Sequence, residues 1–355
     1  MDLTRREFVG GGALALATGS AALARSSTPF ATDSDEHNPA DFTFVHLTDM
    51  HVTPKRRGDQ GYRACIESVR DLEPRPALAL MGGDLAFDGL YNPKADFDEQ
   101  IRLYREISDG LGIPHYPCIG NHDVLGWSSR RKCPADDPEL GKRMIMDRLQ
   151  WQWERPYYSF DHGGWHFAVL DSIHPKQFDH GPGYEPRIGR EQLEWLAYDL
   201  GAAGDRPKVV MTHIAAFCNR GQLGGDPHRK AMDGNMVLWD TAALRDVLER
   251  HSVKALLQGH SHDVEEYRYN DVWYITSAAV SGAWWAGSWT GSLPGYTVFR
   301  CHSDELTWTC RQFAWTEHLE PEDVLERRKI AEQQAAARER AEKLSRERSG
   351  APTPG

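Results

Sequence analysis

Residues 42–51 read Phe-Thr-Phe-Val-His-Leu-Thr-Asp-Met-His, an apolar run that ends in a carboxylate and an imidazole. The run predicts a buried strand, and four later apolar runs also end in polar residues. Those endings are Gly83-Asp84, Gly120-Asn121-His122-Asp123, His213 and Gly259-His260-Ser261-His262. Because open α/β sheets place their sites at the carboxyl ends of strands, the five endings predict one shared site.

Helix-like segments separate the first three of these runs. Residues 58–72 and 93–110 carry apolar side chains near helical spacing. This alternation of strand and helix is typical of a layered α/β fold. Further along, residues 157–170 predict a hairpin with a Gly-Gly turn, and residues 193–200 predict another helix. Residues 265–313 alternate as strands do, and we expect them to form a second sheet.

Composition and charge narrow the functional classes. The chain has 355 residues, of which 40% are hydrophobic and 26% charged, as in ordinary soluble globular proteins. Its length allows one large core or two modest ones. The formal net charge is −11. Such a surface repels polyanions, so we do not expect general nucleic-acid binding.

The N-terminus has the pattern of a targeting segment. Arg5 and Arg6 precede a mild apolar stretch rich in Gly and Ala, and Ala22-Leu23-Ala24 offers a cleavage site. Residues 1–24 therefore resemble a twin-arginine signal peptide, which implies the twin-arginine export machinery as a partner and a periplasmic or otherwise exported protein. The stretch is too short for stable membrane insertion. A chance Arg-Arg pair in a disordered end is the alternative.

The remaining flanks are polar. Residues 25–40 read as a flexible linker, and residues 317–355 form a charged tail that is either a solvated helix beginning at Pro321 or disordered. None of the six cysteines lies in a C-x-x-C pair, so a thiolate metal site is not expected. Cys301 and Cys310 fall on facing strands of the last predicted hairpin. They either form a bridge or stay unpaired, and we expect the second.

Two carboxylates, one amide and four imidazoles of the five endings are candidate metal ligands. These candidate metal ligands are Asp49, His51, Asp84, Asn121, His213, His260 and His262. Nitrogen and oxygen donors suit Fe, Mn, Zn or Co without choosing among them. In extended backbone Asp49 and His51 point the same way and can hold one ion, while slight bending turns His260 and His262 to neighbouring ions. The two oxygens of Asp84 allow it to bridge both.

This ordered set resembles the calcineurin-like metallophosphoesterase superfamily, whose pattern runs D-x-H, G-D, G-N-H-[D/E], a single His and G-H-x-H. The resemblance covers about residues 42–313. It implies an α/β fold, a four-layer sandwich of two facing mixed β-sheets flanked by α-helices, in a domain over residues 41–316. It also implies two divalent metal ions. The first would take Asp49, His51, Asp84 and His262, and the second Asp84, Asn121, His213 and His260.

Two further catalytic residues follow from the same resemblance. His122 is similar to the family's imidazole that contacts the substrate phosphate or protonates the leaving oxygen, and Asp123 is expected to orient its ring and raise its pKa. A histidine that only packs beside Asn121 is the alternative. Phe87 stands where the purple acid phosphatases carry the tyrosine ligand of ferric iron, so a ferric centre is not expected.

The implied reaction is attack on phosphorus by a hydroxide that bridges the two metals. The motif spacing resembles the cyclic-nucleotide and glycerophosphodiester branch, which favours a phosphodiesterase acting on a small-molecule phosphoester. An exported phosphomonoesterase, a phosphatase or nucleotidase with the same site, is the alternative. A binding module would lack several ligands. The metallo-β-lactamase motif H-x-H-x-D-H does not fit residues 260–265, and net charge and export disfavour a nuclease.

Specificity and assembly are less well determined by the sequence. Trp284, Trp285, Trp289 and Tyr296 follow the last histidine pair, and they either stack on a nucleobase or pack in the core. The insertions at residues 124–156 and 214–238 are candidates for a lid over the site. The oligomeric state stays open.

Overall fold

The computed structural model describes residues 40–219 and 235–325, together with residues 328 and 332. All of these belong to one compact unit, residues 37–355. The predicted signal peptide, the linker up to residue 39 and most of the charged tail therefore lie outside the described residues. Of the tail, residues 321–325 are helical, as the proline at a helix start predicts.

The first sheet has five strands in the order β13-β12-β1-β2-β3. Its central strand β1 runs parallel to β2, which runs parallel to β3, while β12 and β13 complete the sheet by antiparallel pairing. The strands are β1 (Phe42–Leu47), β2 (Leu78–Met81), β3 (His115–Pro117), β12 (Gly295–His302) and β13 (Glu305–Gln312). The parallel strands β1, β2 and β3 thus bring Asp49, Asp84 and Asn121 to one edge.

The second sheet has six strands in the order β10-β11-β9-β8-β5-β4, with antiparallel strands only at its two borders. They are β4 (Tyr158–His162), β5 (Trp165–Val169), β8 (Lys208–Met211), β9 (Ala255–Gln258), β10 (Glu265–Tyr269) and β11 (Val272–Thr276). The second sheet expected from residues 265–313 is present, but that region does not form it alone. Two strands of that region extend the second sheet, and the other two pair with β1 in the first.

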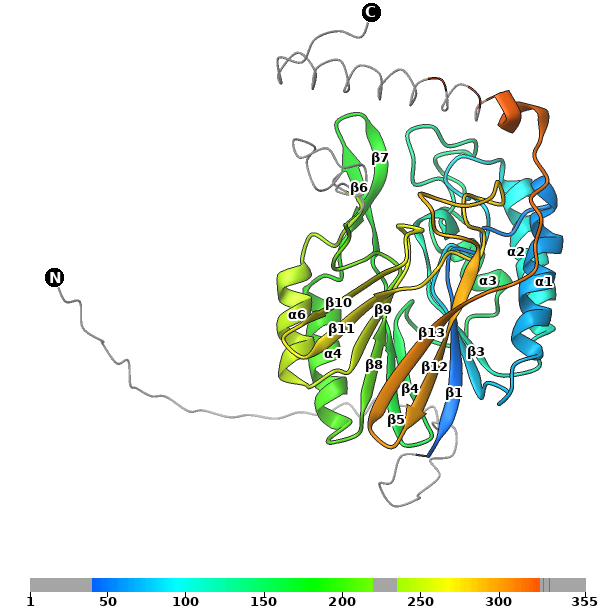
Figure 1. Ribbon diagram of the computed structural model, residues 1–355. Helices are drawn as coiled ribbons and strands as arrows, with labels where there is room; N and C mark the ends of the chain where they lie inside the picture. The colour runs from blue at the N-terminus through cyan, green and yellow to red at the C-terminus, as the bar shows by residue number, and fades with distance from the viewer. Residues whose placement is uncertain (1–39, 220–234, 326–327, 329–331, 333–355) are drawn as a thin grey trace, which may run out of the picture. The chain divides into compact units, whose positions relative to one another are not determined.

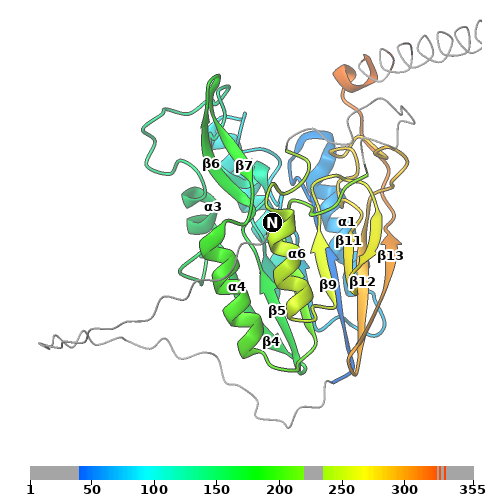
Figure 2. The ribbon, with the colours of Figure 1, turned by 90° about the vertical axis from the view of Figure 1, so that its left-hand side faces the viewer.

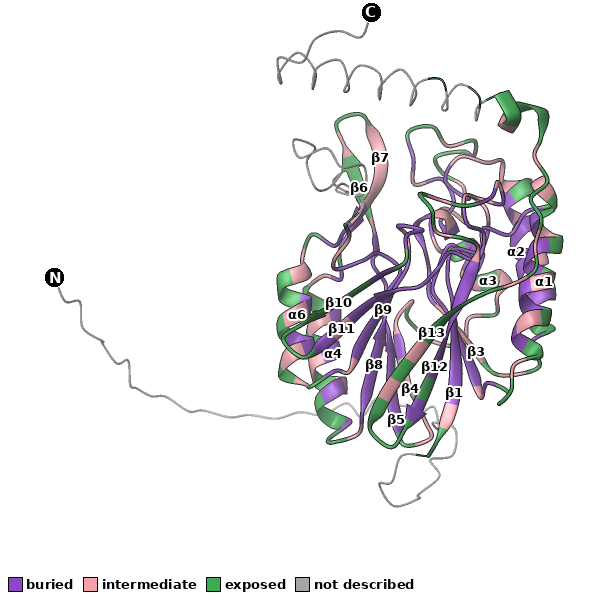
Figure 3. Cartoon of the chain, in the orientation of Figure 1, coloured by how far each residue is buried: buried purple, intermediate pink, exposed green. Residues whose placement is uncertain are grey.

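The two sheets face each other across an aromatic and aliphatic core. Phe44 of β1 stacks on Phe299 at 4.8 Å between ring centroids and meets Phe167 of β5 edge-on at 5.5 Å. Alternate residues of the same strand, such as Val45 and Leu47, point to the opposite side and join a different cluster. The burial of both faces explains why β1, β8 and β9 are mostly apolar, whereas β13 at the border of the first sheet is largely exposed (Figure 3).

Helices cover the outer face of each sheet, which completes the four layers predicted from the sequence (Figure 1). The first sheet is covered by α1 (Gly58–Arg70) and α2 (Lys94–Asp109), and the second by α4 (Arg190–Ala202) and α6 (Thr241–Arg250). The helices expected at residues 58–72, 93–110 and 193–200 are confirmed, whereas α6 was not foreseen. No described helix combines the length and apolar character needed to cross a membrane.

One hairpin was also not foreseen. Strands β6 (Ile173–Phe178) and β7 (Gly181–Pro186) form a separate two-stranded sheet that projects beyond the ends of the main strands (Figure 2). The insertion at 124–156 is mostly irregular, as expected, but contains the short helix α3 (Arg143–Arg148). Residues 220–234 of the other lid candidate lie outside the described residues.

The register of the last hairpin shows whether Cys301 and Cys310 can form a bridge. Cys301 lies opposite Leu306 and Cys310 lies opposite Thr297. The two thiols are therefore offset along the hairpin, and the unpaired alternative is confirmed. No disulfide joins any of the six cysteines, all of which fall within the described ranges.

Candidate metal centre

Two strand endings meet in a first cluster formed by Asp49, His51 and His262. One ligand atom of each side chain lies within 4.8 Å of the others. His262 Nε2 is 3.2 Å from Asp49 Oδ1 and 3.2 Å from His51 Nε2. All three residues are buried. The strands therefore deliver two imidazole nitrogens and one carboxylate oxygen to a single point, as the sequence predicted.

A second cluster lies beside the first and consists of Asp84, His213 and His260. Asn121 joins it, because its Oδ1 is 3.1 Å from His213 Nε2. The His260 and His213 rings meet edge-on with centroids 5.2 Å apart. The two histidines of the last motif thus fall in different clusters, as expected from their spacing.

Asp84 connects the clusters through one oxygen. Its Oδ2 lies 3.4 Å from His51 Nε2 and 3.3 Å from His213 Nε2. Its Oδ1 accepts a hydrogen bond of 2.8 Å from the His122 backbone N–H. The sequence suggested that the two oxygens would each reach one ion. The geometry instead directs Oδ2 alone to both clusters and uses Oδ1 to hold the loop after β3.

The backbone at these ligands is not extended. Asp49 and His51 have φ of 55° and 43°, Asp84 has 51°, and His260 and His262 have 72° and 59°. The expectation that Asp49 and His51 converge through extended backbone is wrong, although they do converge. Left-handed φ values are costly for residues with a side chain and persist where the surrounding structure holds them, typically at functional sites.

Two glycines make room for this convergence. A Cβ on Gly120 would lie 2.2 Å from Asp84 Oδ1, and a Cβ on Gly259 would lie 2.7 Å from Asp49 Oδ2. Neither contact is sterically allowed, so any side chain at these positions would displace a carboxylate. Gly120 and Gly259 therefore serve close approach rather than a positive φ.

The second nitrogen of each imidazole has its own acceptor. His51, His213 and His262 direct Nδ1 to the carbonyl oxygens of Phe87, Gly82 and Gly282, at 3.1, 2.9 and 2.5 Å. His260 directs Nε2 to the Asn235 carbonyl at 3.1 Å. Because a carbonyl only accepts, each of these nitrogens carries the proton. The other nitrogen of each ring is left as the donor for a metal, the arrangement usual for histidine ligands.

The residues present fit a cation in both clusters. In the neutral rings, His51 and His262 turn lone pairs toward each other at 3.2 Å and toward carboxylate oxygens, which is repulsive without a positive charge between them. Burial lowers the pKa of His51 to about 3, so its own proton cannot supply that charge at neutral pH. In the other cluster, burial opposes protonation but Asp84 raises the pKa of His213 to about 9. A proton there stands where a cation would otherwise sit.

His122 lies beside the ligands, with its ring centroid 5.0 Å from that of His51. Its ring partner is Asp88, whose Oδ1 is 3.2 Å from His122 Nδ1. We expected Asp123 in this role, and the structure places that carboxylate elsewhere. Asp123 accepts hydrogen bonds from the backbone N–H groups of Ala86 (3.0 Å) and Gly120 (2.8 Å). It therefore supports two ligand loops instead of the imidazole.

The surroundings of Asp123 and of His122 shift the pKa of each group. Burial and then the Asp84 charge raise the pKa of Asp123 to about 7, even though backbone N–H groups oppose this. For His122, burial opposes protonation, but Asp84 and the hydrogen bond with Asp88 raise the pKa of the imidazole. The ring is thus held by one carboxylate and kept basic enough to carry a proton.

The aromatic cluster predicted after the last motif divides in two. Trp285 and Tyr296 are buried in the core, in agreement with the packing alternative. Trp284 is half-buried and lies against the first cluster, with its ring centroid 4.5 Å from His262 and 5.7 Å from His51. Trp289 meets Trp284 edge-on at 5.1 Å. Of the four aromatic residues in the predicted cluster, only Trp284 and Trp289 therefore border the candidate site.

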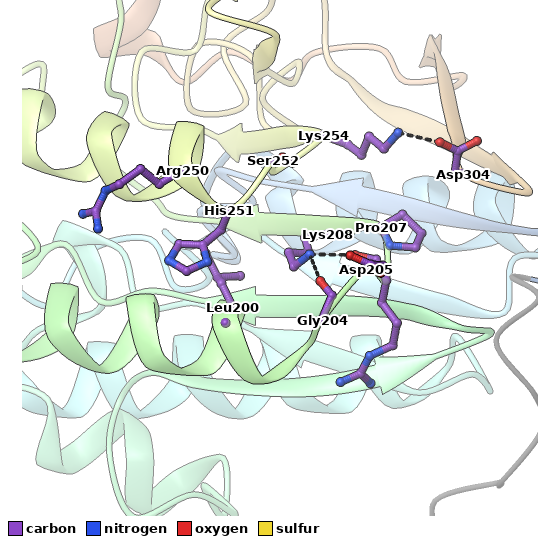
Figure 4. Close-up of a pocket in the computed structure, with 12 residues that line it drawn as sticks. Leu200, Gly204, Asp205, Pro207, Lys208, Arg250, His251, Ser252, Lys254 and Asp304 are labelled. Atoms are coloured by element: carbon purple, nitrogen blue, oxygen red, sulfur yellow. Dashed lines mark hydrogen bonds and ion pairs between the residues drawn. The ribbon is translucent and has the colours of Figure 1, made fainter.

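A hollow of about 380 Å³ lies at the opposite ends of β8 and β9 (Figure 4). Its lining lies mainly in the segments just before these strands, with Lys208 at the start of β8 and Asp304 after β12, whereas His213 and His260 follow β8 and β9. Its cations already have partners, since Lys208 Nζ donates to the Gly204 and Arg206 carbonyls at 2.6 and 2.9 Å. Lys254 Nζ donates to Asp304 at 2.9 Å. The hollow thus has no part in the candidate metal centre.

Comparison with known proteins agrees with this geometry. The profile of the calcineurin-like phosphoesterase family matches residues 42–264. A 3',5'-cyclic-nucleotide phosphodiesterase of Nostoc sp. is 24% identical over 281 residues, covering 76% of this chain and 91% of the relative. A probable glycerophosphodiester phosphodiesterase of Arcobacter nitrofigilis is 23% identical over 250 residues, covering 67% of this chain and 78% of the relative.

The fold is also found among solved structures. A structure of PhoD superposes with a TM-score of 0.51 at 15% sequence identity, covering 80% of this chain and 67% of that one. The family profile spans more than half of the chain, and the five polar strand endings occur in order. The chain therefore belongs to the calcineurin-like phosphoesterase family and is a metal-dependent hydrolase of phosphoric esters.

Proposed function

We propose that this enzyme hydrolyses small-molecule phosphodiesters at a centre of two divalent ions. The observation that carries the proposal is the single oxygen, Asp84 Oδ2, that faces His51 Nε2 in one cluster and His213 Nε2 in the other. A carboxylate oxygen shared between two donor sets is suited to a closely spaced metal pair. Two such ions, of Fe, Mn, Zn or Co, would lower the pKa of a bound water and neutralise charge on the phosphate oxygens.

The chain's ligands would divide as the family resemblance implies. The first ion would take Asp49, His51, Asp84 and His262, and the second Asp84, Asn121, His213 and His260. This division is supported by the two clusters and by the contact between Asn121 and His213. The backbone carbonyls on the far nitrogens fix the ring orientations, so the donor atoms are held in place before any ion binds.

His122 would act as the general acid. Asp88 holds Nδ1 at 3.2 Å, which leaves Nε2 to donate a proton to the oxygen of the departing alcohol. A positioned acid matters because the alkoxide of an ordinary ester is a poor leaving group. Asp123 would serve the reaction indirectly, by holding the Gly120 and Ala86 backbone and hence the loops that carry Asn121 and Asp84.

The preference for diesters is supported by the relatives. The matched proteins of Nostoc sp. and Arcobacter nitrofigilis are named as a cyclic-nucleotide and a probable glycerophosphodiester phosphodiesterase. Both reactions cleave one ester of a phosphodiester and leave a monoester. We extend this preference to the present chain, and we keep the exported phosphomonoesterase as the alternative that the assay must separate.

A paired assay tests the proposal. The protein without residues 1–24 is stripped of metal, reloaded with Mn²⁺ or Zn²⁺, and given bis(4-nitrophenyl) phosphate and 4-nitrophenyl phosphate in parallel. A 3',5'-cyclic nucleotide and a glycerophosphodiester are tested alongside. We expect kcat/KM to be at least about tenfold higher for the diester of the aryl pair. Equal or faster release from the monoester would assign the enzyme to the phosphomonoesterases.

We further propose export through the twin-arginine pathway, supported by Arg5-Arg6 and the Ala22-Leu23-Ala24 site. That pathway carries folded proteins, which suits an enzyme that needs its metals in place. A variant with Arg5→Lys and Arg6→Lys should stay inside the cell with its signal uncleaved. Normal appearance of the processed variant outside the cytoplasm would contradict the proposal.

A further inference from the structure

The loop at residues 281–285, here called the tryptophan loop, contacts every residue of the first cluster. It does so through backbone groups and two indole rings. The Ser281 N–H donates to the Asp49 carbonyl at 3.2 Å, the Gly282 carbonyl accepts from His262 Nδ1 at 2.5 Å, and Trp285 Nε1 donates to the His51 carbonyl at 2.9 Å. The loop therefore forms the outer support of Asp49, His51 and His262.

The same loop is conformationally strained. Trp284 and Trp285 both have positive φ, at 50° and 67°. Two successive large residues in the left-handed region are costly, and such a backbone persists only where neighbouring contacts hold it. Trp285 is anchored in the core. Trp284 is half-buried, lies over the rings of His262 and His51, and needs support from elsewhere.

That support comes from Arg56. Its Nη1 donates to the Trp284 carbonyl at 2.8 Å. Its Nε and Nη2 donate to the two oxygens of Asp323 at 2.7 and 2.5 Å, a fork-to-fork pair that fixes the guanidinium plane. Both side chains are largely shielded from solvent, at 23% and 12% exposure. The pair is therefore better shielded than an ordinary surface ion pair, which contributes little.

Asp323 belongs to the segment that follows the last strand. It accepts a hydrogen bond of 2.9 Å from the Glu320 N–H at the start of the terminal helical turn. Upstream, Trp315 packs edge-on against Trp285 at 5.7 Å between ring centroids. Both contacts lie beyond residue 264, where the match to the family profile ends. The segment is thus fastened to the tryptophan loop at two points.

We propose that Arg56 and Asp323 are positioning residues for the metal centre, which hold the tryptophan loop against Asp49, His51 and His262 and so raise the metal affinity of that cluster alone. The inference rests on the two-metal assignment made above. Neither residue touches a ligand, and their effect passes through Trp284. Among the residues that the structure describes, no hydrogen bond joins the second cluster to the tryptophan loop, so the metal affinity of the second cluster should not change.

A metal titration tests this without relying on turnover. Metal-free full-length protein is titrated with Mn²⁺ by calorimetry, and the two affinities are compared between wild type and Asp323→Asn. Loss of outer support for a histidine ligand typically weakens metal binding about 10–100-fold, so we expect one affinity to fall by about tenfold or more while the other is retained. Asp323→Glu should restore much of the loss. Asp304→Asn, which removes the partner of Lys254 at the other end of the sheets, is the matched control.

The route through Arg56 has its own test. Arg56 holds the backbone carbonyl of Trp284, so removing the Arg56 side chain cuts the link between Asp323 and the tryptophan loop. In an Arg56→Ala background, Asp323→Asn should change neither affinity by more than about twofold. Equal weakening of both affinities, or an undiminished effect in that background, would overturn the inference. The inference would also fail if wild type binds two ions and Asp323→Asn leaves both affinities unchanged. Wild type binding fewer than two ions would instead overturn the two-metal assignment, which keeps the two failures apart.

Discussion

Histidines occupy both ends of the parallel strands, and they are used in opposite ways. At the carboxyl ends, His51, His213 and His262 each give one nitrogen to a carbonyl and turn the other toward a carboxylate. At the amino end of β5, His166 gives both nitrogens to carboxylates, 2.7 Å from Asp161 and 2.8 Å from Asp199. Residue type is the same at both ends, but the partners of the second nitrogen differ.

This difference decides where the positive charge comes from. With carboxylates on both nitrogens, His166 is itself the cation, and Arg206 adds a second positive charge at Asp161. Burial opposes that charge, but the hydrogen bonds with Asp161 and Asp199 outweigh it and raise the pKa of His166. At the carboxyl ends, a backbone carbonyl fixes one nitrogen of each ring, and the other nitrogen faces a carboxylate and is available to an external cation. Burial opposes protonation of His213, but Asp84 raises its pKa, so a proton can occupy that place until an ion binds. One end is built for stability and the other for metal binding.

The largest expected effect is that of Asp84→Asn, which is compared with the same change of Asp199 at the other end of the strands. Asp84→Asn removes the shared oxygen charge, and we expect the loss of several kcal/mol of transition-state stabilisation, at least about a hundredfold in kcat, together with lost metal. Asp199→Asn should leave metal content and kcat near wild type. Elemental analysis and steady-state assays of both variants provide the measurement. Wild-type activity in Asp84→Asn would break the comparison.

Metal removal tests the site at the carboxyl ends without any substitution. Chelation is expected to abolish activity and to lower the free energy of unfolding, because an ion at 100 times its dissociation constant stabilises the fold by about 2.7 kcal/mol per site. Replacing the metal should restore both. Thermal unfolding with and without chelator gives the measurement, and unaltered activity after exhaustive chelation would be the contrary result.

A smaller effect is expected at the proton donor. His122→Ala should lower kcat by about 10²–10⁴-fold for substrates with poor leaving groups, while metal content is retained. An activated aryl leaving group needs no proton, so its turnover should fall much less. Comparing alkyl and aryl diesters measures this difference. An equal loss for both would remove the acid role, and loss of one metal equivalent would make His122 a ligand.

Asp88→Asn sharpens that test, because Asp88 acts on the substrate only through His122. We expect a decrease in kcat of about tenfold, with the same dependence on leaving group, since an amide still accepts from Nδ1 but no longer carries the charge. In the His122→Ala background the substitution should have no further effect on kcat. Additive losses would indicate a separate role for Asp88.

The smallest effect concerns His166 and stability. Because its pKa is raised on folding, its contribution is fully present below the ordinary histidine pKa and is lost as pH rises through the raised value. His166→Gln should therefore destabilise the protein by about 2 kcal/mol at pH 6, and by progressively less toward alkaline pH. Denaturant unfolding of both proteins from pH 6 to 9 measures the difference. A gap that widens with pH would contradict the assignment.

The local sequence pattern was sufficient to predict the strands and the polar residues that follow them. Asp49, Asp84, Asn121, His213 and His260 each follow a short apolar run, and parallel pairing necessarily brings such ends together. The meeting of the ligands was therefore predictable within each sheet, whereas their division between two ions followed only from the family resemblance. The backbone at Asp49 and His51 was not, because left-handed φ values are imposed by tertiary contacts and leave no signature in an Asp-x-His motif.

The missed residues share one cause, which is dependence on contacts distant in sequence. Asp88 holds His122 from another strand ending, while Asp123, the nearer acid in sequence, faces backbone N–H groups. The Trp-Trp pair does not reveal that Trp284 borders the site while Trp285 is in the core. Arg56 gains its role only through Asp323, a separation of 267 residues.

Electron paramagnetic resonance of protein loaded with two Mn²⁺ per chain tests the shared-oxygen geometry most directly. Ions bridged by Asp84 Oδ2 would lie about 3.5–4 Å apart, so we predict the spectrum of a spin-coupled pair. Asp84→Asn should abolish the coupling. A six-line signal of isolated Mn²⁺ that accounts for all the bound metal in the active wild-type enzyme would contradict the account.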